Sequence, residues 1–316
     1  MFFLTFLVLS EVFVFRNLDV YGYSPGFIGQ IAEIDNSFAH ADASGIEAAV
    51  FGDSEGMDAL RPNLLADAAH IRPDTLFNFS LSGGSAYDIA QMYELYKDRL
   101  PRLKRAIVEV NEFQLNNEDA ASDIKFKFFA GLRDRLAVMN GKNYGELLLG
   151  WALKSYDMRT VWQMMIDKYR NDQLRKEVPL HQGGLPPVTW SPGSDKTRQH
   201  AEEVADRWFK GYRVEGVRTQ AFEGMIRDMR QRGIEVVMIQ LPRSSYFEEV
   251  IQTKYAAEQR RYMQKIQSIA DRYGATYTVI PQGRLTLADF RDTNHVNPQG
   301  AAQISAYVGK RWLSAD

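Results

Sequence analysis

The chain carries a serine, an acid and a histidine whose residue types could together perform nucleophilic chemistry. Ser54 follows a short apolar run that ends in Gly52-Asp53, and His295 lies three residues after Asp292 near the C-terminus. A serine hydroxyl is a poor nucleophile at neutral pH, so it needs an imidazole to take its proton and a carboxylate to orient that imidazole. The spacing lets Asp292 and His295 reach each other within one turn of chain. The three residues therefore predict a catalytic triad with Ser54 as nucleophile, His295 as base and Asp292 as its partner.

The same chemistry needs hydrogen-bond donors for the negative charge that develops on the substrate oxygen. Candidates are the backbone N–H of Ser54, the backbone N–H of Gly83 or Gly84, and the side-chain amide of Asn111. Glycine suits the second position because the backbone must come close to the ligand there. Each feature alone is weak, since Gly-Gly is often only a turn and Asn is often a cap. Taken together in their order along the chain, however, they supply every group that one mechanism requires.

Five short apolar runs must position these residues. They are rich in β-branched or aromatic residues, which is typical of strands buried on both faces. The runs are residues 46–51, 75–81, 106–110, 234–241 and 276–280. Amphipathic stretches at residues 86–100, 220–232 and 256–273 alternate with them and predict helices. The alternation predicts an α/β fold with a mainly parallel five-stranded sheet and helices on both faces. Ligands bind at the carboxyl ends of such strands, where the candidate residues lie.

The segment 116–206 breaks this alternation and predicts a helical insertion between the third and fourth strands. Helical patterns cover residues 125–139 and 144–169, and a loop rich in Pro and Gly follows at 183–193. Trp151, Trp162, Met164 and Met165 could form a small core of the insertion, or face a membrane or a partner protein. The core is the simpler expectation, because apolar helical stripes usually become buried.

The first fifteen residues form an apolar run that only Thr5, Ser10 and Glu11 interrupt. A membrane-spanning helix needs about 20 residues. The run is shorter, contains Glu11, and has no Lys or Arg before it. A membrane anchor, an export signal and a buried first helix all stay open. We therefore divide the chain into a hydrophobic N-terminal segment (1–20) and an α/β domain (21–316). We expect an extracytoplasmic place in the cell envelope, with the cytoplasm as the alternative.

Composition excludes several other classes of protein. The 316 residues include 38 basic and 40 acidic ones, and this balance disfavours a nucleic-acid-binding protein. The chain has no cysteine, so disulfides, thiolate metal sites and cysteine nucleophiles are excluded. The remaining histidines have no close histidine partner in the sequence, so we expect surface or loop positions and no metal site. They are His40, His70, His181 and His200. No nucleotide-binding glycine motif occurs, and we expect no cofactor.

Arg243 and Ser244 directly follow the fourth predicted strand. They lie at the edge of the sheet where ligands bind, and an arginine there could contact an anionic substrate. An ordinary loop is the simpler interpretation of the same residues. They are therefore the weaker candidates for substrate binding.

These residues, taken in order, resemble the four sequence blocks of the SGNH/GDSL hydrolase superfamily. The blocks correspond to Gly52-Asp53-Ser54, to Gly83 or Gly84, to Asn111, and to Asp292-x-x-His295. The stretch His295-x-Asn297-x-x-Gly300 is the most specific part, and the resemblance covers about residues 46–312 without the insertion. It implies a flavodoxin-like three-layer sandwich with Ser54, a glycine and Asn111 as the three oxyanion donors. The chain departs from the family at Glu109, where glycine is usual, and at Glu55, where an apolar residue is common.

The Glu55 position, the apolar start and the helical insertion look like one particular branch of that superfamily. The branch contains membrane-anchored proteins that O-acetylate alginate and similar exopolysaccharides, and the D-alanine transfer proteins of teichoic acid. The resemblance implies acyl transfer through Ser54 to or from a cell-envelope polysaccharide, beside a membrane-bound O-acyltransferase. Two alternatives remain: an esterase or lipase for small substrates, and a non-catalytic subunit that binds polysaccharide or a partner.

Overall fold

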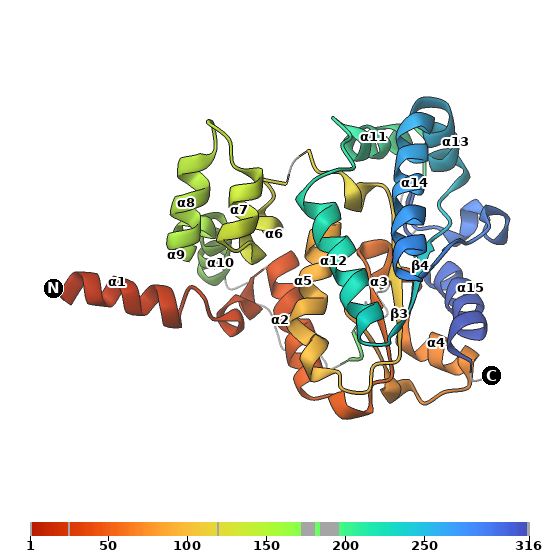
Figure 1. Cartoon of the computed structure of the whole chain (residues 1–316), viewed down its shortest axis with the longest axis horizontal. Helices are drawn as coiled ribbons and strands as arrows, with labels where there is room; N and C mark the ends of the chain where they lie inside the picture. The colour runs from red at the N-terminus through yellow and green to blue at the C-terminus, as the bar shows by residue number, and fades with distance from the viewer. Residues whose placement is uncertain (1, 25, 119, 172–180, 184–195, 315–316) are drawn as a thin grey trace. The chain divides into compact units, whose positions relative to one another are not determined.

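The computed structural model describes residues 2–24, 26–118, 120–171, 181–183 and 196–314. A five-stranded sheet, with strand order β2-β1-β3-β4-β5, runs through the α/β part of the chain (Figure 1). Every neighbouring pair of strands is parallel. The strands are β1 (Ala48–Phe51), β2 (Leu76–Asn78), β3 (Arg105–Glu109), β4 (Glu235–Gln240) and β5 (Thr276–Val279). This order is that of flavodoxin-like folds, so the predicted fold class is confirmed. Each strand lies within a predicted run, except that β3 begins and ends one residue before its run.

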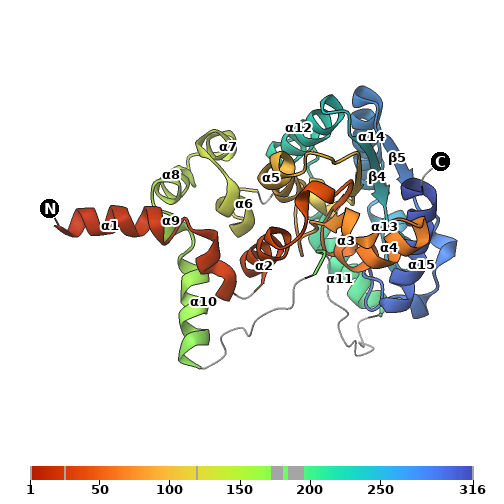
Figure 2. The ribbon, with the colours of Figure 1, turned by 90° about the horizontal axis from the view of Figure 1, so that it is seen from below.

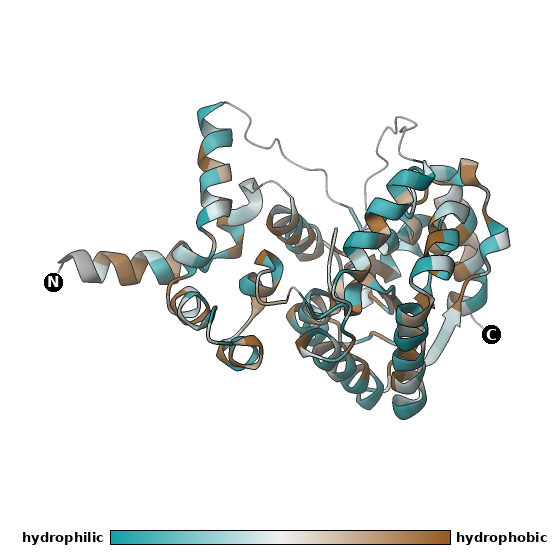
Figure 3. Cartoon of the chain, turned by 90° about the horizontal axis from the view of Figure 1, so that it is seen from above, coloured by the Kyte–Doolittle hydropathy of each residue, from teal (hydrophilic) through white to brown (hydrophobic). Residues whose placement is uncertain are grey.

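Helices cover both faces of the sheet (Figure 2). One layer contains α5 (Ala86–Tyr96), α12 (Val217–Gln231) and α14 (Ala256–Tyr273). The other contains α3 (Ser54–Ala59), α4 (Pro62–Ala69) and α15 (Pro298–Val308). Apolar and polar bands alternate along the helices (Figure 3), as expected for helices with one face on a core. The helix predicted at residues 256–273 has these bounds in the structure, and Gly274 ends it with a left-handed φ of 67°.

Strands β1 to β4 are buried on both faces of the sheet, and their successive side chains point to opposite sides. The edge strand β5 is half-buried to exposed. Val50, Ile107 and Ile239 lie in one apolar cluster together with Leu65 of α4 and Ile304 of α15. Phe51, the neighbour of Val50, instead stacks on Phe79 at 5.3 Å between ring centroids. The near-continuous apolar strands are thus explained by two cores, one on each side of the sheet.

Two further helices extend the α/β part at its carboxyl edge. They are α11 (Arg198–Phe209) and α13 (Ser245–Lys254). Val204, Ala205 and Trp208 of α11 share an apolar cluster with Phe247 and Val250 of α13. The two helices therefore form one packed pair.

The chain divides into two compact units. Unit 1 is Met1–Ser37 with Asp119–Leu180, and unit 2 is Phe38–Glu118 with His181–Asp316. Unit 2 contains the whole sheet. The helices of unit 1 are α1 (Phe2–Phe13), most of α2 (Phe27–Ala39), α6 (Ile124–Phe129), α7 (Leu132–Val138), α8 (Tyr144–Ala152), α9 (Lys154–Asp157) and α10 (Arg159–Arg170). Among the described residues, no helix is both long and apolar enough to cross a membrane.

The helical insertion exists, but its helices are shorter than the sequence pattern predicted. The pattern at 125–139 divides into α6 and α7, and the pattern at 144–169 divides into α8, α9 and α10. A small core forms around Tyr21 and Met158; Met165 belongs to it and Trp162 packs against it. Trp151 and Met164 lie outside this core, each 45% exposed. Of the predicted loop at 183–193, only Gly183 lies among the described residues, and it forms a bridge to Asn78 of β2.

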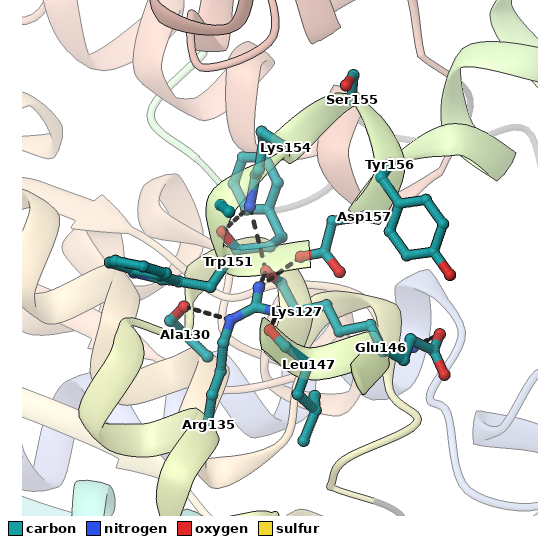
Figure 4. A network of polar contacts seen from close by, with 12 residues as sticks. Lys127, Ala130, Arg135, Glu146, Leu147, Trp151, Lys154, Ser155, Tyr156 and Asp157 are labelled. Carbon is teal, nitrogen blue, oxygen red and sulfur yellow. Dashed lines mark hydrogen bonds and ion pairs between the residues drawn. The ribbon is translucent and has the colours of Figure 1, made fainter. Parts of the chain in front are cut away.

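Buried charges hold the short helices of unit 1 together (Figure 4). The guanidinium of Arg135, from α7, donates to the carbonyls of Ala130 at 2.9 Å and Leu147 at 3.1 Å, and pairs with the Asp157 carboxylate. The ammonium of Lys154 donates to the carbonyl of Lys127 at 3.1 Å, at the end of α6. The carbonyls of Lys127 and Ala130 lie at the end of α6, where helix carbonyls have no partner inside their own helix. The break between α6 and α7 is therefore stabilised by long-range contacts that a local pattern does not reveal.

Candidate active site

Ser54 lies at the point where β1 turns into α3. The strand ends at Phe51, and the Asp53 carboxylate then accepts a hydrogen bond of 2.8 Å from the backbone N–H of Glu55. This contact makes Asp53 the N-cap of α3 and Ser54 its first residue. The backbone N–H groups of a first helical turn have no partner inside the helix. The local fold therefore places the Ser54 hydroxyl and N–H at the carboxyl edge of the sheet.

His295 is presented by a closed loop that precedes α15. Phe290 and Val296 form an antiparallel bridge, and the Arg291 N–H donates to the His295 carbonyl at 2.8 Å. The carboxylate of Asp292 folds back inside this loop and accepts from the backbone N–H groups of Asn294, at 3.1 Å, and His295, at 2.8 Å. The acid is thus fixed by the same loop that carries the histidine.

The residues after His295 explain the rest of its motif. Asn297 caps α15, since its side-chain oxygen accepts from the N–H groups of Gln299 and Gly300, each at 3.0 Å. Pro298 follows at the first helical position, where a missing N–H costs nothing. A Cβ atom at Gly300 would lie 2.4 Å from the Asp289 carbonyl oxygen, so only glycine fits. Asn297, Pro298 and Gly300 therefore fix the start of α15 directly after the histidine loop.

The structure brings Ser54, His295 and Asp292 into one hydrogen-bonded chain. The Ser54 Oγ lies 2.7 Å from the His295 Nε2, and the His295 Nδ1 lies 2.9 Å from the Asp292 Oδ2. An ionised carboxylate only accepts hydrogen bonds, so Nδ1 carries the proton and Nε2 is left to accept from the serine hydroxyl. This is the arrangement in which an imidazole can act as a general base toward serine.

The pKa values of the histidine and the acid follow from their contact. Burial disfavours the charge on Asp292, but the hydrogen bond and positive charge of His295 outweigh it and lower the pKa of Asp292 to about 2. Burial lowers the pKa of His295, yet the hydrogen bond to Asp292 and the charges of Asp292, Asp58 and Glu55 raise that pKa above its usual 6.5. The contact between Asp292 and His295 therefore stabilises the imidazolium that forms when His295 takes a proton.

The predicted oxyanion donors fall into two groups. Ser54 and Gly83 line the pocket in front of the serine, and Gly83 has a φ of 61°, which favours glycine. The N–H of Gly84 instead donates to the Leu81 carbonyl at 3.0 Å. The amide of Asn111 donates to the carboxylates of Asp53, at 2.8 Å, and Glu109, at 3.3 Å. Gly84 and Asn111 are therefore occupied inside the protein in this structure.

Glu109 explains why Asn111 is turned inward. The Glu109 carboxyl is fully buried and accepts from the backbone N–H of Asp53 at 3.0 Å and from the Gln114 amide at 2.9 Å. A Cβ atom at Gly52 would lie 2.8 Å from Glu109, and one at Gly56 would lie 3.0 Å from it. The glycines on either side of the serine thus leave room for the glutamate. Burial, together with the charges of Asp53 and Glu55, raises the pKa of Glu109 well above its usual range.

Glu55, the residue after the serine, connects the two halves of the site. Its carboxylate accepts a hydrogen bond of 2.9 Å from the side-chain amide of Asn294, one residue before His295. Burial is the main cause that raises the pKa of Glu55 to about 8, and the nearby charge of Asp53 adds to it. The contact ties the start of α3 to the histidine loop. Glu55 therefore helps to fix the position of Ser54 relative to His295.

A pocket of about 280 Å³ opens in front of the serine. Asp53, Ser54, Gly83, Asp292, Asn294 and His295 form one side of it, and Phe113, His200, Val204, Arg207 and Trp208 form the other. Four of the latter come from α11. No local pattern connects α11 with the serine, and His200, which we expect at the surface or in a loop, lies on this helix. The one usable signal was the spacing of residues 200, 204 and 207, which lie on one face of a helix.

Comparisons with known proteins give distant likenesses only. No family model matches the chain, and no curated protein matches it. Among solved structures it is similar to a GDSL-like lipase from Bacteroides thetaiotaomicron, with a TM-score of 0.40 and 9% identity over 93% of this chain and 96% of that chain. It is also similar to a protein from Agrobacterium tumefaciens assigned as an arylesterase, with a TM-score of 0.34 and 10% identity over 84% and 96%. Likenesses this distant assign no role to any residue.

The two weaker candidates for substrate binding lie away from the serine's pocket. Arg243 is buried, and its guanidinium bridges the carboxylates of Glu112, at 2.5 Å, and Glu248, at 2.7 Å. Ser244 is the N-cap of α13 and accepts from the Phe247 N–H at 3.3 Å. The Ser244 N–H also donates to the Thr293 carbonyl at 3.0 Å, inside the histidine loop. These contacts give both residues a structural role, which their place after β4 did not reveal.

Proposed function

We propose that the protein is a serine ester hydrolase or O-acyltransferase that works through an acyl group on Ser54. The observation that carries this proposal is the chain of contacts from the Ser54 hydroxyl, through both ring nitrogens of His295, to the Asp292 carboxylate. The pocket in front of the hydroxyl gives a substrate carbonyl access to it. Perturbed pKa values of both the acid and the histidine in one pocket are typical of catalytic groups.

In the first half of the reaction, the Ser54 oxygen attacks the carbonyl carbon of an ester. His295 takes the hydroxyl proton on Nε2, and Asp292 stabilises the imidazolium. The backbone N–H groups at Ser54 and Gly83 are the candidates to donate to the oxyanion. The tetrahedral intermediate then collapses, the bond to the alcohol breaks, and the alcohol oxygen takes the proton from Nε2. The acyl group remains on Ser54.

In the second half, a hydroxyl of the acceptor attacks the acyl carbon. His295 takes the proton of that hydroxyl and returns it to the Ser54 oxygen as the acyl bond breaks. With water as acceptor the reaction is hydrolysis, and with a sugar hydroxyl it is acyl transfer. A pocket of about 280 Å³ suits an acetyl group or another small acyl group.

We further propose that the acceptor or substrate is a cell-envelope polysaccharide. The resemblance of the sequence blocks to exopolysaccharide O-acetylation proteins supports this, and Phe113 and Trp208 add aromatic surface to the pocket. The same resemblance, with the apolar first residues, supports an extracytoplasmic place beside a membrane-bound O-acyltransferase. Incubation with an activated acetyl ester and neutral or acidic oligosaccharides, read by mass spectrometry, separates transfer from hydrolysis.

A non-catalytic binding subunit is the second candidate, and Asn111 favours it. Both hydrogens of the Asn111 amide are directed to buried carboxylates, so the third expected oxyanion donor is turned away from the pocket. A folded protein that binds oligosaccharide but hydrolyses no activated ester would support this candidate over the enzyme.

The decisive test uses p-nitrophenyl acetate with Ser54→Ala and His295→Ala variants of the full chain. Triad members act as a unit, so each variant is expected to lose on the order of 10⁴- to 10⁶-fold in kcat. Ser245→Ala is the matched control, because Ser245 is exposed and also follows a strand, but does not line this pocket. Circular dichroism checks that each variant folds. A Ser54→Ala protein with near-normal activity would refute the proposal.

A further inference from the structure

One face of α11 forms the far wall of the serine's pocket. His200, Val204 and Arg207 line the pocket and are spaced by four and three residues, so they project from one side of the helix. Trp208 adds its ring to the same wall. The wall therefore presents an imidazole, an aliphatic side chain, a guanidinium and an indole to whatever lies against Ser54.

This wall is fixed to the rest of unit 2 at two places. The buried side of α11 packs on α13, and Val204 and Trp208 belong both to this packing and to the pocket lining. The Trp208 ring meets the Phe247 ring at 4.9 Å between centroids. At the end of α11, the buried amide of Asn116 donates to the carbonyls of Trp208 at 2.9 Å and Lys210 at 3.0 Å. Asn116 lies only a few residues after β3. The position of Arg207 relative to the sheet edge is therefore set by packing and by hydrogen bonds.

Arg207 is the one arginine or lysine among the described residues that line this pocket. Its side chain is exposed, and within the described ranges no carboxylate pairs with it. Asp206, which directly precedes Arg207, accepts from the Lys254 ammonium at 2.5 Å. Glu203, one turn earlier, accepts from the Gln199 amide at 3.0 Å. The acids of the pocket are also occupied, Asp292 by His295 and Asp53 by Asn111. The Arg207 guanidinium is thus left available to a ligand.

We propose that Arg207 binds a carboxylate of the ester substrate and so makes the site selective for anionic esters. The inference rests on the proposed function, because it assigns a substrate class to the same pocket. A guanidinium presents a rigid fork of N–H donors that matches a carboxylate, and charge-assisted hydrogen bonds of this kind are strong. Val204 and Trp208, beside it, would contact the apolar part of the same substrate.

The test compares two esters that differ only in charge, 4-acetoxybenzoate and methyl 4-acetoxybenzoate. The measured quantity is the ratio of kcat/KM for the anionic ester to that for the neutral ester. Arg207→Gln is expected to lower this ratio about tenfold, the lower end for loss of a charge-assisted hydrogen bond at an exposed site. Arg207→Lys keeps the charge without the fork and is expected to recover part of the ratio. Added salt should lower the wild-type ratio and leave that of Arg207→Gln nearly constant.

Lys210→Gln is the matched control, because it removes a positive charge three residues away, outside the pocket lining. It should keep the wild-type ratio. If Arg207→Gln leaves the ratio of kcat/KM values at its wild-type level, the inference is overturned, even if the rates for the two esters fall together. Binding of 4-acetamidobenzoate, which is not hydrolysed, is followed by ligand-observed NMR and needs no turnover. If no ester is cleaved, the proposed function fails, and this binding arm still decides for or against Arg207.

Discussion

Units 1 and 2 both bury charged side chains, but the group around Ser54 in unit 2 is arranged differently from the network of unit 1. In unit 1, Arg135 meets the carboxylate of Asp157 and several helix carbonyls, so unlike charges are paired (Figure 4). In unit 2, Asp53, Glu55 and Glu109 lie buried close to one another around Ser54, and backbone or side-chain amides donate to them. The first arrangement satisfies each charge. The second crowds like charges at the carboxyl edge of the sheet.

The two groups of buried charges differ in what they do for the protein. Paired charges that end helices fix the arrangement of short segments with little apolar core of their own. Crowded carboxyls cost stability, since burial and mutual repulsion both disfavour their charged forms. Crowded buried carboxyls of this kind cluster at functional sites. The crowded group surrounds Ser54, and the paired group of unit 1 belongs to the unit that lacks this serine. Unit 2 has a buried ion pair of its own, Arg243 with Glu112 and Glu248, and these residues do not line the serine's pocket.

The largest expected effect comes from breaking the charge pair of unit 1. Arg135→Met leaves Asp157 buried without its cation, and removing one partner of a buried pair costs about 3–5 kcal/mol. Hydrogen exchange should show α6 to α9 losing protection first. The double variant Arg135→Met with Asp157→Leu should recover much of the loss, because two apolar residues replace the pair. A single variant as stable as the wild type would mean that the network contributes nothing.

The next effect compares two glycines that make room for buried carboxyls. A Cβ atom at Gly150 would lie 2.1 Å from Asp157 in unit 1, and one at Gly52 would lie 2.8 Å from Glu109 in unit 2. Each Gly→Ala change should cost about 1–3 kcal/mol through overpacking. Only Gly52→Ala should also lower kcat, because Glu109 holds the backbone of Asp53 beside Ser54. Gly145→Ala is the control, since a Cβ there meets nothing within 4 Å.

A smaller effect tests whether Glu109 acts as a neutral acid. Glu109→Gln keeps an oxygen for the Asp53 N–H and is expected to cost less than about 1 kcal/mol. Glu109→Ala leaves the buried N–H of Asp53 and the amide of Gln114 without partners, at a cost of about 1–3 kcal/mol. Denaturant unfolding and kcat are measured for both variants. Equal damage from the two substitutions would show that the charge of Glu109 is required.

The smallest expected effect is a shift in the pH dependence of activity. Only neutral His295 can accept the serine proton, so kcat/KM should rise with pH through the raised pKa of His295, above 6.5. Asp58, with a pKa of about 6 because it is buried, carries a negative charge that favours the imidazolium. Asp58→Asn removes this charge and should move the midpoint to lower pH. A midpoint that moved upward would contradict the electrostatic account.

Much of the fold followed from local patterns in the sequence. Buried parallel strands appear in the sequence as short apolar runs. The rule that ligands bind at the carboxyl ends of such strands selects Ser54 and Asn111 from the sequence alone. The helix 256–273 was predicted with its observed bounds because a glycine cap follows it. The side chains that the structure adds to the site depend on tertiary contacts. Nothing local reveals that Glu109 fills the space beside Gly52, or that α11 forms the far wall.

The side-chain directions of polar residues were the weakest part of the sequence prediction. Asn111 and Arg243 lie where the strand rule places them, yet their side chains turn to buried carboxylates instead of the pocket. Which partner a buried amide or guanidinium takes depends on residues distant in sequence, such as Glu109 and Glu248. A composition with 38 basic and 40 acidic residues gives no sign of these pairings.

The measurement that tests the central claim most directly is labelling of the full chain with a fluorophosphonate probe, read by mass spectrometry. A working triad requires a label that is confined to Ser54, is lost in Ser54→Ala, and is weaker at low pH, where His295 is protonated. A folded wild-type protein that takes no label, or a label that persists in Ser54→Ala, would contradict it.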